Sequence, residues 1–297
     1  MNRREEGFLL LTGHLGNPDR KPLTVAQFRT LAKRVQAMER PKENREMTVE
    51  DLKAIGYGTS FAEHILRLLS ENVLLSRYLD KGARLCCTPV TRVSKAYPVS
   101  VRGKLGLDSP GCFWARGDLG MLSTPMIALV GSREMKDANR RFAREVGRQA
   151  ALQGYTLVSG NARGADREAQ ESCLAAGGKV ISVMADELYK QPPRESMLYL
   201  SEDGFEEPFS AQRALSRNRV IHSLGSKTFV AQSDFQRGGT WDGTSRNLNH
   251  GWSDVYCFAD GSKALDTLCA LGAVPVIMGD LADISALGSH IKNLFEE

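Results

Sequence analysis

Three short segments of the chain combine glycine with arginine in a way that suits phosphate binding. They are Gly131-Ser132-Arg133, the run from Ser159 to Asp166, and Arg217-Asn218-Arg219 together with the glycine-rich stretch from Gln236 to Arg246, which we expect to be a loop. Glycine allows a sharp turn and a close approach of the backbone, and an arginine guanidinium can bind phosphate through two parallel hydrogen bonds. Backbone N–H groups at a helix start can also bind an anion. We therefore expect the three segments to converge on one phosphate-binding site.

Arg217 and Arg219 are separated by one residue on a predicted helix. At about 100° per residue their side chains leave the helix roughly 200° apart, so both cannot face one phosphate. We expect one of them to anchor the helix, with an ion pair between Arg219 and Asp166 as the candidate contact. The other is expected to point into the binding cleft.

These segments lie within an alternation of strands and helices that begins at Pro125. Short apolar runs predict strands, and apolar residues at helical spacing predict helices. The predicted strands are 127–130, 156–158, 180–184, 228–231 and 255–258, and the predicted helices are 137–153, 166–176 and 211–224. Such alternation is typical of a Rossmann-like, doubly wound, mostly parallel sheet of the α/β class, which binds ligands at the carboxyl ends of its strands.

The chain is expected to have three parts. Residues 1–80 predict a small helical domain, residues 81–124 predict an irregular extension leading into the core, and residues 125–297 predict the Rossmann-like domain. Within the helical part, Leu52 to Leu66 resembles a helix-hairpin-helix of the SAM-like kind, with two glycines around one residue. That turn is either a phosphate contact or only a tight turn that packs a small bundle, because few basic residues flank it.

Composition limits the function less than the motifs do. The 297 residues are 42% hydrophobic and carry a net charge of +4, which is too small to indicate a nucleic-acid partner by itself. Between Phe209 and His250, however, six basic residues stand against two acidic ones. No apolar run approaches the roughly 18 residues of a membrane span, so we expect a cytoplasmic protein with no membrane partner. The six cysteines and five histidines lack metal-ligand or disulfide spacing, and we expect no metal and no cofactor.

The order of the motifs resembles one family. Ala128 to Arg133, Val158 to Asp166, Gly178 to Val183 and Arg217 to Ile221, with Phe113 to Leu119 upstream, are similar to the DNA-processing protein A (DprA, or Smf) family. The resemblance implies a non-catalytic, Rossmann-like binder of single-stranded DNA that helps to load a RecA-type recombinase during recombination or DNA uptake, with a homodimer as a further possibility. The chain departs from the family at Gln170, in place of a histidine, and at Gln232, in place of an acidic residue.

The motifs and the resemblance together give one set of candidate residues. The expected DNA phosphate contacts are Gly131, Ser132, Arg133, Ser159, Gly160, Asn161, Arg163, Arg217, Asn218, Arg219, Arg237, Gly238, Gly239 and Thr240. Asp166 and Trp241 are expected to shape the pocket.

Two other functions fit parts of the same pattern. The stretch from Gly238 to Thr244 also resembles the glycine-threonine loop of Lonely-guy type nucleotide phosphoribohydrolases, but those enzymes need a nearby glutamate. Asn247 stands near that spacing, and an amide cannot act as a base. The second alternative is a module that senses a free nucleotide. Stacking of bases on Trp241, Phe235 or Tyr189 would favour a strand over a nucleotide, although each ring can equally belong to the core.

Overall fold

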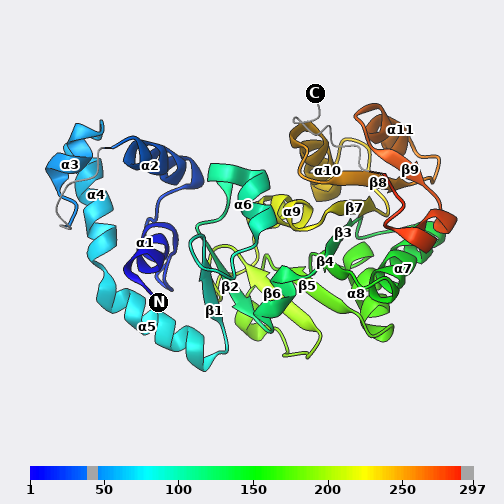
Figure 1. Ribbon diagram of the computed structural model, residues 1–297, viewed down its shortest axis with the longest axis horizontal. Coiled ribbons are helices and arrows are strands. Elements are labelled where there is room, and N and C mark those ends of the chain that lie inside the picture. The colour runs from blue at the N-terminus through cyan, green and yellow to red at the C-terminus, as the bar shows by residue number, and fades with distance from the viewer. Residues whose placement is uncertain (39–45, 289–297) are drawn as a thin grey trace.

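The computed structural model describes residues 1–38 and 46–288. The end of the predicted domain 125–297, beyond residue 288, lies outside the described residues. Figure 1 shows a group of amino-terminal helices beside a sheet that is flanked by helices. The expected α/β, Rossmann-like fold is confirmed.

The amino-terminal part contains five helices: α1 Arg3–Thr12, α2 Val25–Ala37, α3 Val49–Ala54, α4 Thr59–Ser70 and α5 Asn72–Arg84. The side chains of Asn2, Thr24 and Thr48 cap the first three helices by accepting backbone N–H hydrogen bonds. A small core that includes Phe28, Leu31, Leu52, Ile65 and Leu68 holds α2, α3 and α4 together.

The hairpin-like turn joins α3 to α4 through residues 55–58. Gly56 adopts a φ of +91°, which favours glycine, and Gly58 precedes the first turn of α4. The Arg34 guanidinium donates a hydrogen bond to the Gly56 carbonyl and lies 4.3 Å from the centre of the Tyr57 ring. Contact between this turn and DNA stays a prediction.

The described residues form one nine-stranded sheet in the order β1-β2-β6-β5-β4-β3-β7-β8-β9. The strands are β1 Thr88–Thr91, β2 Cys112–Arg116, β3 Met126–Val130, β4 Thr156–Ser159, β5 Lys179–Val183, β6 Met197–Ser201, β7 Lys227–Val230, β8 Asp254–Phe258 and β9 Val274–Val276. Pairs β1–β2 and β2–β6 are antiparallel, whereas every other pair is parallel.

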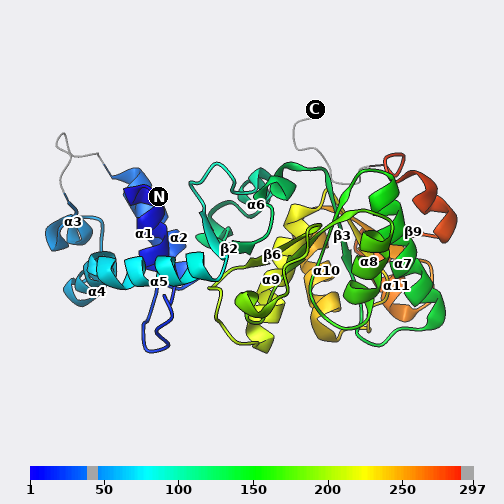
Figure 2. The ribbon, with the colours of Figure 1, turned by 90° about the horizontal axis from the view of Figure 1, so that it is seen from below.

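Helices cover both faces of the sheet (Figure 2). Helices α7 Asp137–Leu152 and α8 Ala165–Ala175 pack on one face, and α6 Val99–Leu105, α9 Ala211–Leu224, α10 Gly238–His250 and α11 Lys263–Ala270 contribute to the other. Strand β3 shows the alternation, because Ile127 and Leu129 belong to the first core while Ala128 and Val130 belong to the second. Four short 3-10 helices complete the described elements: η1 Gly106–Asp108, η2 Leu119–Ser123, η3 Leu188–Lys190 and η4 Met278–Asp283.

The expectation that residues 81–124 are irregular is wrong. This segment contributes α6 and the two antiparallel strands β1 and β2, which extend the sheet beyond β6. Pro89 is compatible with a strand here because β1 lies at the edge of the sheet, where one side of the backbone needs no partner. Strands β6 and β9 were also not predicted.

The glycine-rich stretch from Gly238 to Thr244 was expected to be a loop, and this too is wrong. It forms the first two turns of helix α10. A Cβ added to Gly243 would lie 3.1 Å from the Cβ of Asn218 and from Nε2 of His222. Glycine at this position therefore allows α10 to approach α9 closely.

The structure also bears on the cysteines and on membrane association. All six cysteines have free thiols. Within residues 1–38 and 46–288, no helix is both long and apolar enough to cross a membrane.

Candidate functional site

A cavity of about 600 Å³ opens at the carboxyl edge of the sheet, and we call it the switch-point cavity. It lies where β3 and β7 are neighbours although the chain leaves β3 towards β4 on the other side. Such a reversal of strand order is the place where doubly wound sheets bind ligands. Its walls come from the loops after β3, β4 and β7, the starts of α8 and α10, and helix α9 with the residue Phe209 that lies shortly before it.

The switch-point cavity brings together most of the predicted residues. Those that line it are Gly131, Ser132, Arg133, Asp166, Arg217, Asn218, Arg237, Gly238, Gly239 and Thr240. Those that do not line it are Ser159, Gly160, Asn161, Arg163, Arg219 and Trp241. Sequence reasoning missed the apolar residues of the lining, which are Val130, Ala162, Phe209, Ala211, Ala214, Leu215 and Ile221. Phe209 and Leu215 stand out among them because the structure leaves 56% and 43% of these side chains exposed.

Close packing fixes the loop after β3. A Cβ added to Gly131 would lie 2.5 Å from the Cβ of Ala165, so only glycine fits between β3 and the start of α8. The Ser132 N–H donates to the Gln232 carbonyl at 2.9 Å. The Gln232 side chain accepts a hydrogen bond from the Lys136 N–H at 3.0 Å and donates one to the Glu134 carbonyl at 3.1 Å. The backbone carbonyl of Gln232 therefore holds the loop before Arg133, and its side-chain amide holds the loop after Arg133.

Side chains of helix α8 hold the loop after β4 in place through hydrogen bonds. Gln170 Nε2 donates to the Ser159 hydroxyl at 2.7 Å and also to the Gly160 carbonyl. Ser159 and Gln170 are both buried, so the structure gives them an internal role under the loop. The Asp166 carboxylate accepts a hydrogen bond from the Ala162 N–H at 3.2 Å, which ties the loop to the first turn of α8.

The two arginines of α9 take different places from those expected. Arg217 Nη2 lies 3.9 Å from Asp166 Oδ2, and Arg217 Nη1 donates to the Val183 carbonyl at 2.8 Å. Arg219 contacts Glu202 and the Asp108 carbonyl. The proposed pairing of Arg219 with Asp166 is therefore wrong, because the rotation of about 200° between the two side chains turns Arg217 to Asp166 and Arg219 away from it.

Arg217 and Asp166 form a buried pair at the base of the switch-point cavity. Their side chains are 10% and 8% exposed. Burial raises the pKa of Asp166 above its ordinary value, although Arg217 opposes this shift, and burial lowers the pKa of Arg217. A Cβ added to Gly160 would collide with the Arg217 guanidinium, so glycine leaves the space that this side chain fills.

Three arginines around the cavity remain exposed and unpaired. Arg133, Arg163 and Arg237 are exposed, and none forms an ion pair within residues 1–38 and 46–288. The other basic residues between Phe209 and His250 are engaged within the protein: Arg213 with Asp203, Arg217 with Asp166, Arg219 with Glu202, Arg246 with Asp242, and Lys227 with the Leu287 carbonyl. Most of the positive excess of that segment is thus used inside the fold.

The start of helix α10 adds backbone donors to the cavity. Arg237 precedes the helix without capping it by a side-chain hydrogen bond, and Gly238, Gly239 and Thr240 form the first turn. Asn218 Nδ2 donates to the Gly239 carbonyl at 2.9 Å and so fixes this turn to α9. The unpaired N–H groups and the positive end of the helix dipole suit a bound anion.

Asn247 is buried and does not line the switch-point cavity. Its Nδ2 donates to the Ser253 hydroxyl at 2.9 Å and lies 3.2 Å from Nδ1 of His222. Burial lowers the pKa of His222 to about 3, so that imidazole is neutral at physiological pH. Asn247 therefore belongs to a buried network that holds α9, α10 and the start of β8 together.

Comparison with known proteins shows the family to which the chain belongs. The family model for DNA recombination-mediator protein A matches residues 88–264, a range that contains every residue of the switch-point cavity. The chain belongs to the DNA recombination-mediator protein A family. Protein Smf of Escherichia coli is 30% identical over 142 residues, which are 44% of this chain and 38% of the relative. DNA processing protein DprA of Bacillus subtilis is 26% identical over 176 residues, which are 56% of this chain and 57% of the relative.

Solved structures of the family share the fold. DNA processing protein A of Streptococcus pneumoniae has a TM-score of 0.72 and 24% identity, with 95% of this chain and 97% of that chain covered. The Helicobacter pylori protein, described for its single-stranded DNA binding mode, has a TM-score of 0.52 and 21% identity, with 64% and 90% covered. The chain spans 38% and 57% of the lengths of the E. coli and B. subtilis relatives.

Proposed function

We propose that this protein binds single-stranded DNA without catalysis and that the switch-point cavity holds the sugar–phosphate backbone. The observation that carries the proposal is the group of three exposed arginines, Arg133, Arg163 and Arg237, which form no ion pair with any described residue and lie beside the open start of α10. Family membership supports the same function, because the H. pylori member is described as binding single-stranded DNA.

Each wall of the cavity has a distinct part in this proposal. Arg133 and Ser132 contact one phosphate from the rigid end of β3, and the N–H groups of Gly239 and Thr240 contact another. The buried Arg217–Asp166 pair positions the loops and does not touch DNA. The exposed Phe209 and Leu215 side chains offer apolar contact to unpaired bases.

A free nucleotide is the main alternative ligand. A cavity of about 600 Å³ is large enough for one, since pockets for small ligands measure roughly 300 to 1,000 Å³. The exposed Arg163 lies on the loop after β4 but outside the cavity lining, and a single nucleotide in the cavity leaves it unused. A DNA strand that extends beyond the cavity can contact Arg163, which favours DNA over a free nucleotide as the ligand.

Fluorescence anisotropy can separate the candidates. The assay compares a single-stranded oligonucleotide, the same sequence as duplex, and mononucleotides, each at two salt concentrations. We expect the single strand to bind most tightly, with little sequence preference and with weaker binding at the higher salt concentration. Equal or tighter binding of a mononucleotide would reject the proposal. Release of free base from a nucleoside monophosphate would reject its non-catalytic part.

We further propose that the DNA-bound protein helps to load a RecA-type recombinase and acts as a homodimer. Both statements extend what the family resemblance implies. Adding the protein to single-stranded DNA should shorten the lag before recombinase filaments form, and light scattering should give twice the 32.6 kDa chain mass. An unchanged lag or a monomeric mass would each reject the corresponding statement.

A further inference from the structure

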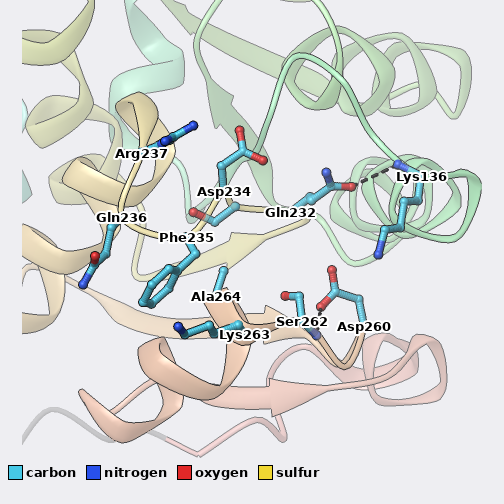
Figure 3. Close-up of a pocket in the computed structure, with 11 residues that line it drawn as sticks. Lys136, Gln232, Asp234, Phe235, Gln236, Arg237, Asp260, Ser262, Lys263 and Ala264 are labelled. Carbon is cyan, nitrogen blue, oxygen red and sulfur yellow. Dashed lines mark hydrogen bonds between the residues drawn. The ribbon is translucent and has the colours of Figure 1, made fainter.

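A second cavity of about 740 Å³ lies beside the switch-point cavity, and we call it the Phe235 cavity. The loop after β7, the residue before α7 and the start of α11 line it (Figure 3). Asp234 and Arg237 line both cavities. The Arg237 N–H donates to the Asp234 carbonyl at 3.2 Å, so a single tight turn separates the two. A ligand that follows the protein surface passes directly from one cavity to the other.

Three cations and two carboxylates, Asp234 and Asp260, line the Phe235 cavity. Lys136, Arg237 and Lys263 are exposed, and none forms an ion pair within the part of the chain that the structure describes. Figure 3 shows Lys136 across the cavity from Phe235 and Lys263. Asp260, between them, accepts hydrogen bonds from Asn139 Nδ2 at 2.8 Å and from the Ser262 N–H at 3.0 Å. The Asp260 carboxylate therefore fixes the loop after β8 to helix α7.

The cavity also contains an aromatic face. Lys263 Nζ lies 4.2 Å from the centre of the Phe235 ring, and Trp241 supports the same ring edge-on at 5.4 Å. A cation over a ring marks a face that is accessible and can take a flat ligand in its place. Trp241 itself packs against the core and lines neither cavity, so its role is to support Phe235.

One buried polar group in the cavity has no partner. Ser233 lines the cavity, its exposed fraction is 9%, and its hydroxyl lacks a hydrogen-bond partner among the described residues. Buried hydroxyl groups are normally hydrogen-bonded, so an unsatisfied one indicates a missing ligand or water.

We propose that the Phe235 cavity is a second nucleotide subsite, which takes the nucleotide next to the one in the switch-point cavity. The base stacks on Phe235 and displaces Lys263 from the ring, and the Ser233 hydroxyl binds the edge of the base. Lys136 and Lys263 contact the phosphate, and Arg237 contacts the phosphate between the two subsites. This inference rests on the proposed binding of single-stranded DNA.

The test uses the full chain, thymidine 5′-monophosphate, a longer oligothymidine and three variants. Thymidine 5′-monophosphate fills the switch-point cavity alone, whereas a strand of roughly eight nucleotides reaches both cavities. Phe235→Leu removes the stacking face, Lys263→Gln removes a charge, and Phe235→Tyr keeps the ring. Lys179→Gln is the matched control, because Lys179 is an exposed residue at the start of β5, at the opposite edge of the sheet.

For the longer strand we expect Phe235→Leu and Lys263→Gln each to weaken binding about tenfold, and Phe235→Tyr and Lys179→Gln to bind like the parent. Binding of thymidine 5′-monophosphate should be unchanged in all four. A longer strand with 5-bromodeoxyuridine should photocrosslink to Phe235. Equal affinities of Phe235→Leu and the parent for the longer strand, with Arg133→Ala still defective, would overturn the second subsite alone. A parent protein that binds no single strand would instead overturn the proposed function.

Discussion

Arg133 has a fixed position because its neighbours leave the loop little freedom. Gly131 packs against Ala165, and Gln232 holds the backbone on both sides of Arg133. The guanidinium is exposed and forms no ion pair among the described residues, and its charge only adds to that of Arg217 in lowering the pKa of Asp166, so its removal should leave the fold intact. A charge-assisted hydrogen bond to phosphate contributes about 1.5 to 3 kcal/mol, and Arg133→Ala should therefore weaken single-stranded DNA binding roughly tenfold to a hundredfold.

The matched control for Arg133→Ala is Arg148→Ala, on α7. Arg148 is paired with Glu145 one turn away, on an exposed helix face. We expect Arg148→Ala to bind DNA like the parent and both variants to keep the parental melting temperature. Normal DNA binding by Arg133→Ala would place the phosphate elsewhere.

Arg219 should instead matter for folding. It pairs with Glu202, and the two side chains are 11% and 10% exposed. Arg219→Ala leaves the carboxylate buried without its partner and should cost about 3 to 5 kcal/mol of the free energy of unfolding at neutral pH. Measurements of Tm and of DNA affinity test this prediction. We expect a lower Tm for Arg219→Ala, and the parental DNA affinity at a temperature where the variant is fully folded.

The loss of stability caused by Arg219→Ala should depend on pH. Burial raises the pKa of Glu202 above its ordinary value of 4.5, and Arg219 opposes the rise. Without Arg219 the pKa rises further, so the folded state keeps a proton that the unfolded chain has released. Stability is then lost as the pH increases above 4.5. The difference in Tm between parent and Arg219→Ala should grow as the pH rises above 4.5, and a constant difference would contradict this account.

At the scale of elements, the contact between β3 and α8 sets the shape of the cavity. Gly131→Ala forces a methyl group against Ala165 at the helix start and should reduce the free energy of unfolding by about 1 to 3 kcal/mol. It should also weaken DNA binding, because Arg133 and α8 move apart. Gly103→Ala is the control, since its added Cβ meets nothing within 4 Å on α6. Denaturant unfolding that gives equal stability for the two variants would contradict the close packing.

The sequence predicts the elements that bury regular apolar runs and misses those set by tertiary contacts. Helix α9 matches its predicted bounds, and β3, β7 and β8 agree within a residue or two. Strand β6 was not predicted from the sequence, although all of Met197 to Ser201 is buried in the structure. Strand β1 was also not predicted, because this strand contains a proline, and proline argues against a strand except at the edge of a sheet. The glycines of α10 suggest a loop, because local propensity carries no information about how closely α9 approaches.

At the scale of the whole molecule, the sequence predicts where the site lies but not which charges are free. The topology of a doubly wound sheet brings Arg133, Arg217 and Arg237 to one edge. Whether an arginine is available depends on partners such as Asp166, on α8, and Glu202 and Asp203, in the loop after β6, which the fold brings next to α9. A count of basic residues between Phe209 and His250 therefore overstates the charge that is available to a ligand.

The salt dependence of binding tests the central claim most directly. For single strands, the slope of log K against log salt concentration changes by about 0.7 for each phosphate contact. Replacing Arg133, Arg163 and Arg237 together by alanine should make the slope shallower by about 2. A control that removes three exposed cations elsewhere, Arg84, Arg148 and Lys179, changes the net charge equally and should keep the parental slope. A parental slope in the first variant, with single-stranded DNA still bound, would show that the strand does not contact these arginines.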